Sequence, residues 1–520
     1  MDSHDRDDRP RSYHRHFSRR KLLAGAAGLS AGAVVSGQMP TVVAHAAETG
    51  DALHGVELRG MYLTSKDPLA EGRFGAMFKR LPAFAPSDTL LENLAKTMVE
   101  DQTIPDDDNL NTSPRLFAGF TFIGQFIDHD TTFDNTPLDK QQADPDAKVN
   151  FRTPRYDLDS VYGRGPTTEP QFYDPMDKDK LLLEPNVNGV EDVHRDSNGH
   201  AIIPELRNDE NLIIVQLHKA VAKFHNRIVD DVRAQGMRRE WVFEAARRLT
   251  RWHYQWAVIH DFLPRFVGDE LVPNGAVYKE VAGKPPVINL NYYKPTNRDG
   301  RPFMPVEFAV AAYRFGHSII RPFYIINDTG KVDVFGPPGG RNLNGGRPIP
   351  SDLVIEWKNI LDVDGSGTAK KPRKIDTRLS LPLANLPASV VPPPDPTVHL
   401  AIRNTLRGKR VGLPSGQQVA KAMRAQVLSN ETLGLSNDPG WGGEAPLWFY
   451  ILREAELPPA NTQRLGPVGA RIVAEVLVGL LQRDPNSYLY LDSSWKPAPP
   501  IAPATGQFTF VDLLKYARAA

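Results

Sequence analysis

The segment from Gly124 to Asp130 brings an amide, a histidine and two carboxylates together, directly after the apolar run Leu116–Ile123. Burying ionisable groups among apolar residues is unfavourable unless they are paired, bound to a metal or used in catalysis. Imidazole gains and loses a proton near neutral pH, so His129 is a candidate acid-base group. The segment therefore indicates proton transfer or metal binding, and a structural histidine is the alternative.

A second segment carries oxygen ligands at alternating positions. Thr153 offers a hydroxyl and a carbonyl, Arg155 offers a carbonyl, and Asp157 and Asp159 offer carboxylates. Hard cations such as calcium prefer oxygen ligands. Together with Asp130, these residues predict a calcium site, and a polar turn is the alternative.

Three further segments place charged and amide side chains at or near helical patterns. They are Pro204–Glu210, Tyr313–His317 and Asn404–Arg407. In their order and residue types, the five segments resemble the animal-type haem peroxidases of the peroxidase-cyclooxygenase superfamily. The resemblance extends over roughly residues 70–490, and the combination of segments is far more specific than any single one.

The resemblance implies a haem b cofactor between two histidines. His129 matches the distal histidine, Gln125 the distal glutamine that helps to place peroxide or halide, and Arg207 the distal arginine. His317 matches the proximal ligand of the haem iron. The implied activity is the reduction of hydrogen peroxide and the oxidation of small donors (halide, thiocyanate or phenolic compounds) through a ferryl intermediate.

Other residues match the surroundings of the haem in the family. Asn404 matches the residue that is hydrogen-bonded behind the proximal histidine, and Arg314 and Arg407 match positions near the haem propionates. Asp128 and Glu210 fall where mammalian members form ester bonds to haem methyl groups. For Glu210 the alternative is an acid that favours the start of a helix. The oxygen ligands of the second segment, with Asp130, match the family's calcium site.

Physical chemistry agrees with these implied roles. A neutral imidazole at His129 can take a proton from bound peroxide and return it to the outer oxygen. The guanidinium of Arg207 can stabilise the negative charge that develops on the leaving oxygen. An amide carbonyl at Asn404 that accepts the Nδ1 proton of His317 would fix the tautomer of this ligand. Calcium bound to Asp130 would hold the segment next to the acid-base group.

The sequence departs from the family pattern at informative positions. Asn211 stands where one family member has a methionine that forms a sulfonium link to the haem, so that bond is impossible here. Chloride oxidation is therefore disfavoured, whereas bromide, iodide, thiocyanate and phenol-like donors stay open. Ile123 replaces a common aromatic residue, and the cysteines of vertebrate members are absent. These features are typical of a bacterial, exported member.

Two alternative functions remain. A fatty-acid dioxygenase of the same superfamily needs a radical-forming tyrosine three residues before the proximal histidine, where this chain has Arg314. Tyr313 is one residue further back, about 100° around an α-helix, and should point elsewhere. The other alternative is a non-catalytic secreted haem-binding or adhesion protein. Retention of His129, Arg207 and Gln125 argues against it, because storing haem requires no acid-base group.

Composition excludes several classes of site and partner. The chain has no cysteine, which excludes disulfides, thiolate catalysis and cysteine-ligated metals. Lysine plus arginine equals aspartate plus glutamate, at 62 each, so no global field favours nucleic acid. We expect hydrogen peroxide and a small electron donor or halide as partners.

The N-terminus is typical of a twin-arginine signal peptide. Arg19 and Arg20 precede the small, apolar run Leu22–Val35, which is too short to cross a membrane, and Ala44–Ala46 offers a cleavage site. We expect export to the periplasm or outside the cell and no integral membrane segment in the mature chain. The predicted division is a signal peptide (1–46), an N-terminal arm (47–90) and a haem peroxidase domain (91–520).

Hydrophobic periodicity predicts a mainly α fold, a single large helical domain with long loops and little strand. Ser87 is a candidate N-cap for a helix through Met98. The helical segments are 212–232, 241–263, 307–320, 398–406, 417–428, 445–456 and 468–481.

Three features suggest other sites but do not support them. Asp362–Gly367 begins like a calcium loop but lacks the final acidic ligand, so it predicts a turn. The glycines of 336–346 lack the context of a nucleotide site and predict a loop. His218 and His225 lie on one face of the helix 212–232 but match no ligand position of the family, so we interpret them as packing residues.

Overall fold

The computed structural model describes residues 72–100, 109–133, 150, 152, 154–295, 302–388, 390, 391, 397–435 and 437–520. All of them belong to one unit of the chain, His54–Ala520. The predicted signal peptide, the first part of the predicted arm and Thr153 lie outside the described residues. The predictions for them therefore stay predictions.

Helices make up most of the regular structure, which confirms the predicted mainly α fold. The N-terminal half contains α4 (Asp88–Thr97), α5 (Gly119–Thr131), α6 (Asp159–Tyr162), α7 (Leu212–Ala234), α8 (Val242–Ala257) and α9 (Leu263–Val267). The C-terminal part contains α10 (Leu400–Arg410), α11 (Gly416–Ala422), α12 (Asn430–Leu433), α13 (Leu447–Glu456), α14 (Pro467–Arg483), α15 (Tyr488–Leu491) and α16 (Phe510–Tyr516).

The strands are short and, within the described ranges, pair only two by two. The pairs are β1 (Phe74–Gly75) with β6 (Met304–Pro305), β2 (Leu183–Pro185) with β3 (Glu191–Val193), β4 (Tyr278–Val281) with β5 (Lys284–Ile288), and β7 (Phe323–Ile325) with β8 (Lys331–Asp333). The first pair is parallel and the others are antiparallel. Because ribbons this small cannot form a layer, the core is built by helices.

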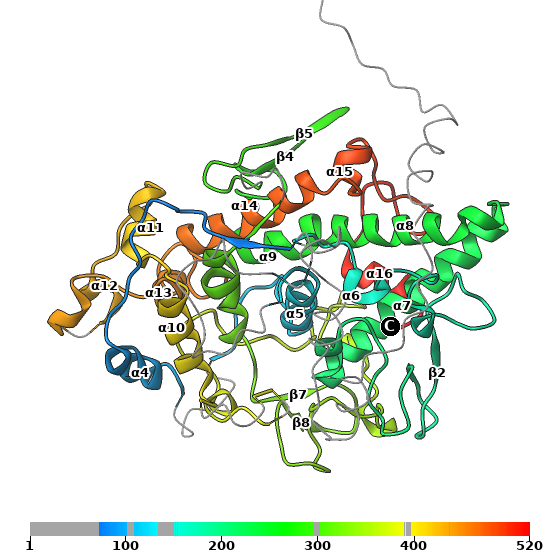
Figure 1. The fold of residues 1–520 in the computed structure, drawn as a ribbon, viewed down its shortest axis with the longest axis horizontal. Coiled ribbons are helices and arrows are strands. Elements are labelled where there is room, and N and C mark those ends of the chain that lie inside the picture. The colour runs from blue at the N-terminus through cyan, green and yellow to red at the C-terminus, as the bar shows by residue number, and fades with distance from the viewer. Residues whose placement is uncertain are drawn as a thin grey trace, which may run out of the picture. The chain divides into compact units, whose positions relative to one another are not determined.

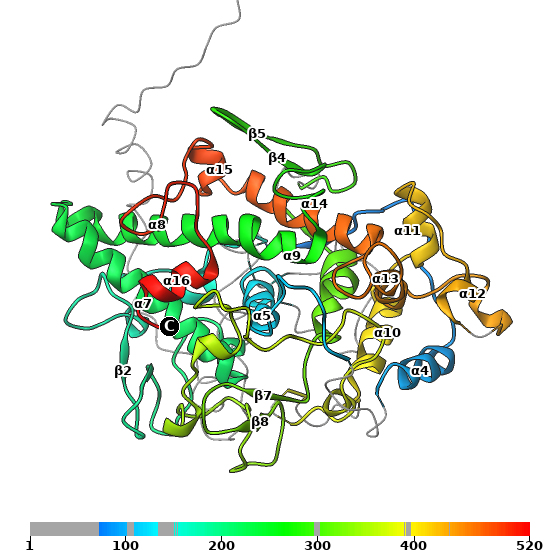
Figure 2. The same cartoon turned by 180° about the vertical axis from the view of Figure 1, so that it is seen from behind.

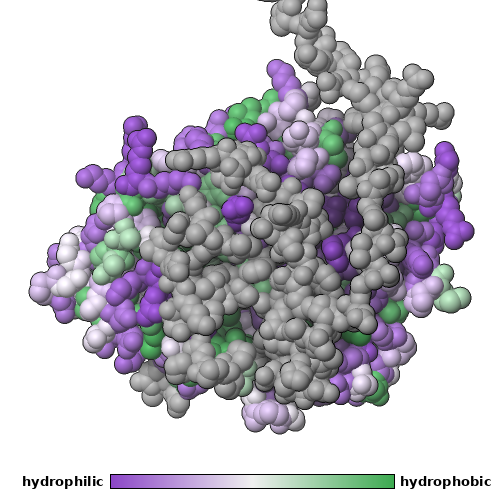
Figure 3. Space-filling model, viewed as in Figure 1, coloured by the Kyte–Doolittle hydropathy of each residue, from purple (hydrophilic) through white to green (hydrophobic). Residues whose placement is uncertain are grey.

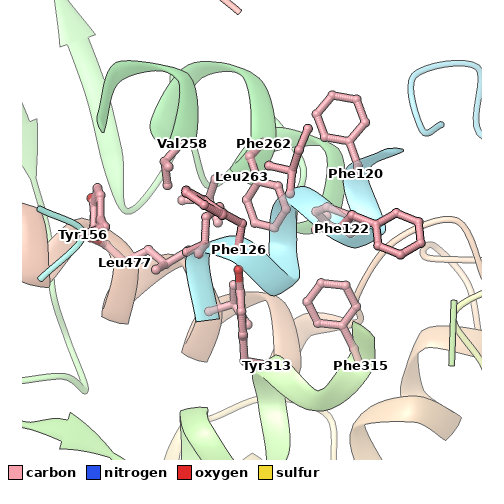
Figure 4. Close-up of a cluster of buried hydrophobic side chains, with 14 of the residues drawn as sticks. Phe120, Phe122, Phe126, Tyr156, Val258, Phe262, Leu263, Tyr313, Phe315 and Leu477 are labelled. Carbon is pink, nitrogen blue, oxygen red and sulfur yellow. The ribbon is translucent and has the colours of Figure 1, made fainter. Parts of the chain in front are cut away.

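Helix α5 lies at the centre of the helical array in both ribbon views (Figure 1, Figure 2). Ten of its 13 residues are buried, and it packs against α7, as expected for a helix that is apolar on most of its surface. In Figure 4, Phe120, Phe122 and Phe126 project from α5 among the rings and aliphatic side chains of neighbouring segments. Among these neighbours are Phe262 and Tyr313.

The predicted helix 241–263 changes its winding along its length. Helix α8 runs into a π turn, η7 (Val258–Phe262), which continues into α9. Pro264, at the start of α9, has no backbone N–H and therefore cannot continue the α-helical hydrogen-bond ladder. The π turn accommodates the missing donor and lets the chain continue along α5.

The prediction of one α-helix over 307–320 is wrong. The segment begins as a π turn, η8 (Glu307–Ala311), and continues as a 3-10 helix, η9 (Ala312–His317). A 3-10 helix has three residues per turn, so Arg314 and His317 are aligned on one face. The change of winding therefore places two of the predicted site residues side by side.

Other helix predictions are confirmed with shifted ends. Ser87 caps α4 by accepting a hydrogen bond from the backbone of Leu90. Helix α11 is shorter than predicted because the chain reverses at Arg424, which has a left-handed backbone (φ 55°). Asp362 closes a turn by accepting from the backbone N–H of Gly367, and 336–346 is a loop, as predicted.

Within the described ranges, no helix is both long and apolar enough to cross a bilayer. On the face drawn in Figure 3, hydrophilic and hydrophobic side chains of described residues are interspersed. This mixture agrees with the balanced charge of the sequence.

Candidate active site

Helix geometry separates the members of the polar cluster on α5. Gln125, Asp128 and His129 are spaced i, i+3 and i+4 and therefore share one face, which lines a cavity of about 400 Å³. Asp130 is the next residue around the helix and does not line this cavity. The same segment thus serves two sites, one on each side of α5.

The cavity collects the predicted haem-site residues from four segments. Nine of the predicted residues line it: three from α5, two from around η5 (Leu206–Asp209), two from η9 and two from α10. These residues are Gln125, Asp128, His129, Arg207, Glu210, Arg314, His317, Asn404 and Arg407. Residues far apart in the sequence are therefore brought together as predicted.

His129 is buried, and its ring belongs to a chain of hydrogen bonds. Its Nδ1 lies 3.0 Å from Oδ1 of Asn208, whose Nδ2 lies 3.1 Å from Nδ1 of His218. Burial lowers the pKa of His218 to about 4, so this ring is neutral and accepts from the amide. The carbonyl of Asn208 then faces His129 and accepts its Nδ1 proton, while Nε2 lies 3.4 Å from Oε1 of Glu210.

The interpretation of His218 as a packing residue was incomplete, and Asn208 was not recognised from the sequence. The one signal for Asn208 in the sequence was its position as a polar residue directly after Arg207. His225 is a structural residue, as predicted, because its ring contacts the hydroxyl of Tyr162 and the carbonyl of Asp179.

Arg207 is held rigidly at the edge of the cavity. Its Nε donates to Oε1 of Glu205 over 3.1 Å, and its Nη2 donates to the carbonyls of His129 and Thr132 over 3.0 and 2.7 Å. The guanidinium also lies over the ring of Phe133, 4.4 Å from its centroid. The cation is therefore tied directly to the end of α5.

Glu205, which the sequence did not single out, links the two sites. It accepts hydrogen bonds from Arg207 and from the buried Arg152, and Arg152 also donates to Asp159 over 2.9 Å. Burial opposes ionisation of Glu205, but the charges of Arg152 and Arg207 outweigh burial and hold its pKa well below the usual range. An ionised network thus connects the cavity with the candidate calcium site.

The candidate calcium site contains three buried carboxylates. Oxygen atoms of Asp130, Asp157 and Asp159 lie within 4.8 Å of one another. Burial and the charges of the neighbouring aspartates raise the pKa of Asp130 well above its ordinary value and that of Asp157 to about 6. A divalent cation would remove this repulsion, so the donor set fits calcium. Arg155, two residues before Asp157, stays a predicted ligand.

The surroundings of His317 differ in one detail from the prediction. Asn404 directs its Nδ2 to Nδ1 of His317, at 2.8 Å, whereas its Oδ1 accepts from Arg314. The carbonyl faces Arg314 because a guanidinium can only donate. Burial and the charge of Arg314 lower the pKa of His317 to about 3, so its ring is neutral and suited to bind a metal.

The predicted ester-forming carboxylates already have partners in the protein. Oδ1 of Asp128 accepts from the hydroxyl of Thr132 over 2.8 Å. Oε1 of Glu210 accepts from Nε2 of Gln125 over 2.6 Å and lies 3.4 Å from Nε2 of His129. Both carboxylates line the cavity, but an ester bond would require each of them to change partners.

Tyr313 contradicts the expectation that it points away from the site. Its ring lines the cavity, and its hydroxyl donates to the carbonyl of Gly124 over 3.1 Å. Figure 4 shows the hydroxyl directed at α5. The expectation rested on α-helical geometry, and the π and 3-10 turns change the direction of this side chain.

The cavity suits a haem in size and in chemistry. Its volume of about 400 Å³ lies in the range of small-molecule and cofactor sites. Most of its walls are apolar, with rings such as Phe122 and Phe335, while Arg314, Arg403 and Arg407 supply positive charge for carboxylates. Arg403 was not predicted from the sequence. His317 and His129 would supply an iron ligand and an acid-base group.

Comparisons with known proteins point in the same direction. A family model described as animal haem peroxidase matches residues 134–429, more than half of the chain. Thyroid peroxidase of Rattus norvegicus is 23% identical over 404 residues, which cover 68% of this chain and 40% of that protein. Chorion peroxidase of Aedes aegypti is 27% identical over 163 residues, covering 28% of this chain and 19% of that protein. The chain thus spans about two fifths of the thyroid relative.

Solved structures share the fold. Peroxidase A from Dictyostelium discoideum has a TM-score of 0.56 at 15% identity and covers 86% of this chain and 92% of that one. Fatty acid alpha-dioxygenase from Oryza sativa has a TM-score of 0.54 at 15% identity and covers 79% of this chain and 75% of that one. At these identities the similarity establishes the fold alone.

Proposed function

We propose that this chain, which belongs to the animal haem peroxidase family, is an exported peroxidase that reduces hydrogen peroxide and oxidises small donors. The family implies haem, and haem b is the form that we propose. The observation that carries this proposal is the position of His129, whose Nδ1 is hydrogen-bonded to Asn208, on the same cavity as His317. This arrangement offers an iron ligand together with a separate acid-base group.

Residues on the η9 and α10 side of the cavity would bind the haem. His317 would hold the haem iron, and Arg314, Arg403 and Arg407 would bind its propionates. Bound haem would supply the redox chemistry with peroxide. Asn404 would orient His317; for its Oδ1 to accept the Nδ1 proton, the amide would have to turn, and Arg314 would have to give up its hydrogen bond to Oδ1.

On the α5 side, the protein would manage the proton and the charge of peroxide. Nε2 of His129 would take the proton of peroxide and return it to the departing oxygen. Arg207 would stabilise the negative charge there, because its position is held by Glu205 and two backbone carbonyls. Gln125 would orient peroxide or a halide.

We propose calcium as a structural ion at Asp130, Asp157 and Asp159, with Thr153 and the carbonyl of Arg155 as further ligands. Its role would be to hold the end of α5. Support comes from the close approach of the buried carboxylates. Calcium removal should loosen His129, which is adjacent to Asp130.

We propose bromide, iodide, thiocyanate and phenolic compounds as candidate donors, in preference to chloride. Asn211 occupies the position of the sulfonium-forming methionine, and it caps α7 by accepting from the backbone of Ile213. Ester bonds from Asp128 and Glu210 remain part of the proposal. Retention of haem on the chain after denaturing extraction would support them, and freely extractable haem would contradict them.

The decisive experiment is the peroxide reaction of the haem-loaded His129→Ala variant, followed by stopped-flow absorbance. Loss of acid-base catalysis should slow the reaction by about 10² to 10⁴. Haem binding should persist, because His317 is unchanged. A matched control is His200→Ala, a histidine whose side chain is 58% exposed. An unchanged rate in His129→Ala would contradict the assignment of His129 as the acid-base residue.

A second candidate function, fatty-acid dioxygenation, is favoured by one observation: Tyr313 lines the cavity. Oxygen consumption with a fatty acid, absent in Tyr313→Phe, would support it. A third possibility, a haem-binding or adhesion protein without turnover, predicts no spectral reaction of the haem-loaded protein with peroxide. The hydrogen-bonded chain of His129, Asn208 and His218 argues against that function, because a protein that only stores haem does not need an oriented acid-base group.

A further inference from the structure

A second cavity lies across α9 from the candidate active site. Its volume is about 330 Å³, within the range of small-molecule sites. Phe266 lines the active-site cavity, and the next residue, Val267, lines this second one. The two cavities are therefore neighbours that share the wall formed by α9.

The walls of the second cavity are largely apolar. Leu271, Met423, Leu465 and Ala470 contribute aliphatic surface. The ring of Tyr292 forms a further wall, and its hydroxyl is already used, because it donates to the carbonyl of Met423 over 2.6 Å. A ligand for this cavity therefore needs an apolar body.

Arg471 gives the cavity a polar group with unused donors. Its Nε donates to Oε1 of Glu475 over 2.6 Å, but its Nη2 is buried with no acceptor among the described residues, and no hydrogen bond involves Nη1. The guanidinium lies over Tyr292, 5.8 Å from the ring centroid. Buried donors without acceptors are unfavourable, so an acceptor on a ligand would be stabilising.

Glu475 cannot supply that acceptor by turning. It is fully buried and also accepts from the backbone N–H groups of Asn291, Tyr292 and Tyr293. Its carboxylate is thereby held in place, and it fixes the orientation of Arg471. The cationic group is pre-positioned, which lowers the entropy lost on binding a ligand.

Two paired arginines form the basic part of the cavity wall. Arg464 and Arg471 both line it, and Glu270 is the acidic residue of the wall. Glu270 is paired with Arg464, and its side chain is 60% exposed, so solvent screens this pair. Arg471 is paired with the buried Glu475, but its Nη2 has no acceptor among the described residues and remains for a ligand. Carboxylates are suitable partners because they can accept two parallel hydrogen bonds from a guanidinium.

We propose that this cavity binds an amphipathic monocarboxylate, with its carboxylate on Arg471 and its apolar chain between Met423, Leu465 and Ala470. An amphipathic monocarboxylate matches both the apolar surface of the walls and the unused donor of Arg471. Binding at this site does not depend on the peroxidase proposal, because it uses none of the haem-site residues.

The test is titration of the full-length, haem-loaded protein with decanoate by calorimetry, with 1-decanol as the uncharged probe. Decanoate should bind with a dissociation constant on the order of 100 µM, and 1-decanol should bind at least tenfold more weakly. The haem absorption spectrum should stay unchanged during the titration. A spectral shift that follows binding would place the ligand in the active-site cavity and overturn the proposal.

Variants assign the site. Arg471→Gln should weaken decanoate binding about tenfold to a hundredfold and leave the affinity for 1-decanol nearly unchanged. Ala470→Phe should abolish binding of both probes by filling the cavity, and this variant keeps the pair of Arg471 and Glu475. Arg238→Gln removes a charge from a side chain that is 77% exposed and should have no effect. Unchanged decanoate affinity in Ala470→Phe would contradict the proposal even if Arg471→Gln fails to fold.

Discussion

The two sides of the active-site cavity are built differently. On the α5 side, a regular α-helix carries His129, and buried side chains hold its ring and the neighbouring Arg207 in place. On the η9 side, His317 ends a 3-10 helix that follows a π turn, and its ring contacts Asn404, which also accepts a hydrogen bond from Arg314. On the α5 side, the residues that contact His129 and Arg207 are themselves held by further hydrogen bonds. On the η9 side, the position of the His317 ring depends on the orientation of the Asn404 amide.

A network of charged hydrogen bonds makes the α5 side rigid. Arg152, Glu205 and Asp159 form a chain of charged hydrogen bonds from the cavity to the candidate calcium site. Such a network is stable when every member is paired and fails when one is removed. On the η9 side, Arg314 donates to Asn404 and to the carbonyl of Ala309, and Asn404 contacts His317, so single changes there should alter the orientation of His317 more than the stability of the fold.

The largest expected effect is that of Glu205→Gln. The variant leaves Arg152 with less compensating charge in a buried position, and we expect a loss of about 3 to 5 kcal/mol in the free energy of unfolding at neutral pH. Denaturant unfolding measures this loss. Glu184→Gln, which removes a partly exposed partner of His194, is the matched control and should cost less than about 1 kcal/mol.

The pH dependence of the same variant has a defined sign. The pKa of Glu205 is lowered in the folded protein relative to its ordinary value of 4.5. Its contribution to stability is therefore complete above that value and is lost as the pH falls through the lower, folded-state pKa. The difference between wild type and Glu205→Gln should shrink in acid, and a difference independent of pH would contradict the ionised network.

The next effect concerns peroxide and separates the two sides. Arg207→Gln removes the charge held at the end of α5 and should slow the peroxide reaction by about 10² to 10³. Arg314→Gln, the matched change on the η9 side, should slow it by less than about tenfold, because Arg314 contacts Asn404. Equal losses in the two variants, measured by stopped-flow absorbance, would show that the two sides do not have separate tasks.

A smaller effect distinguishes the two asparagines that face the histidines. Asn208→Ala should slow the peroxide reaction about tenfold to a hundredfold, because the Nδ1 proton of His129 loses its acceptor. Asn404→Ala should instead weaken haem affinity by a similar factor, since it orients the ligand His317. Haem titration and peroxide kinetics of both variants test this division, and the reverse pattern would contradict it.

The smallest expected effect is that of Tyr313→Phe. The hydroxyl donates one hydrogen bond to the carbonyl of Gly124 and thereby connects the two sides. Its loss should lower the free energy of unfolding by about 0.5 to 1.5 kcal/mol and leave the peroxide reaction nearly unchanged. A large loss of peroxide activity would indicate a redox role for Tyr313 and would favour the dioxygenase alternative.

The sequence alone was sufficient for the fold class, and it singled out residues that the fold brings to one cavity. The periodicity of 212–232 and 468–481 matches α7 and α14 closely, because long amphipathic or apolar segments bury a face that local pattern reveals. Nine predicted residues line one cavity, since their types and order reflect the chemistry that they share. Residue types thus carry information on chemistry that does not depend on exact backbone geometry.

Tertiary structure alone decided how those residues are oriented and supported. The π and 3-10 turns of 307–317 turn Tyr313 into the cavity, and nothing in the local pattern distinguishes these turns from an α-helix. His218 has its role only because α7 packs against η5, which brings it to Asn208, and Glu205 links the two sites only because the distant Arg152 is folded against it. Hydrogen bonds between segments depend on atomic positions to within less than an ångström and on which acceptor pairs with each donor. Only the folded chain determines both.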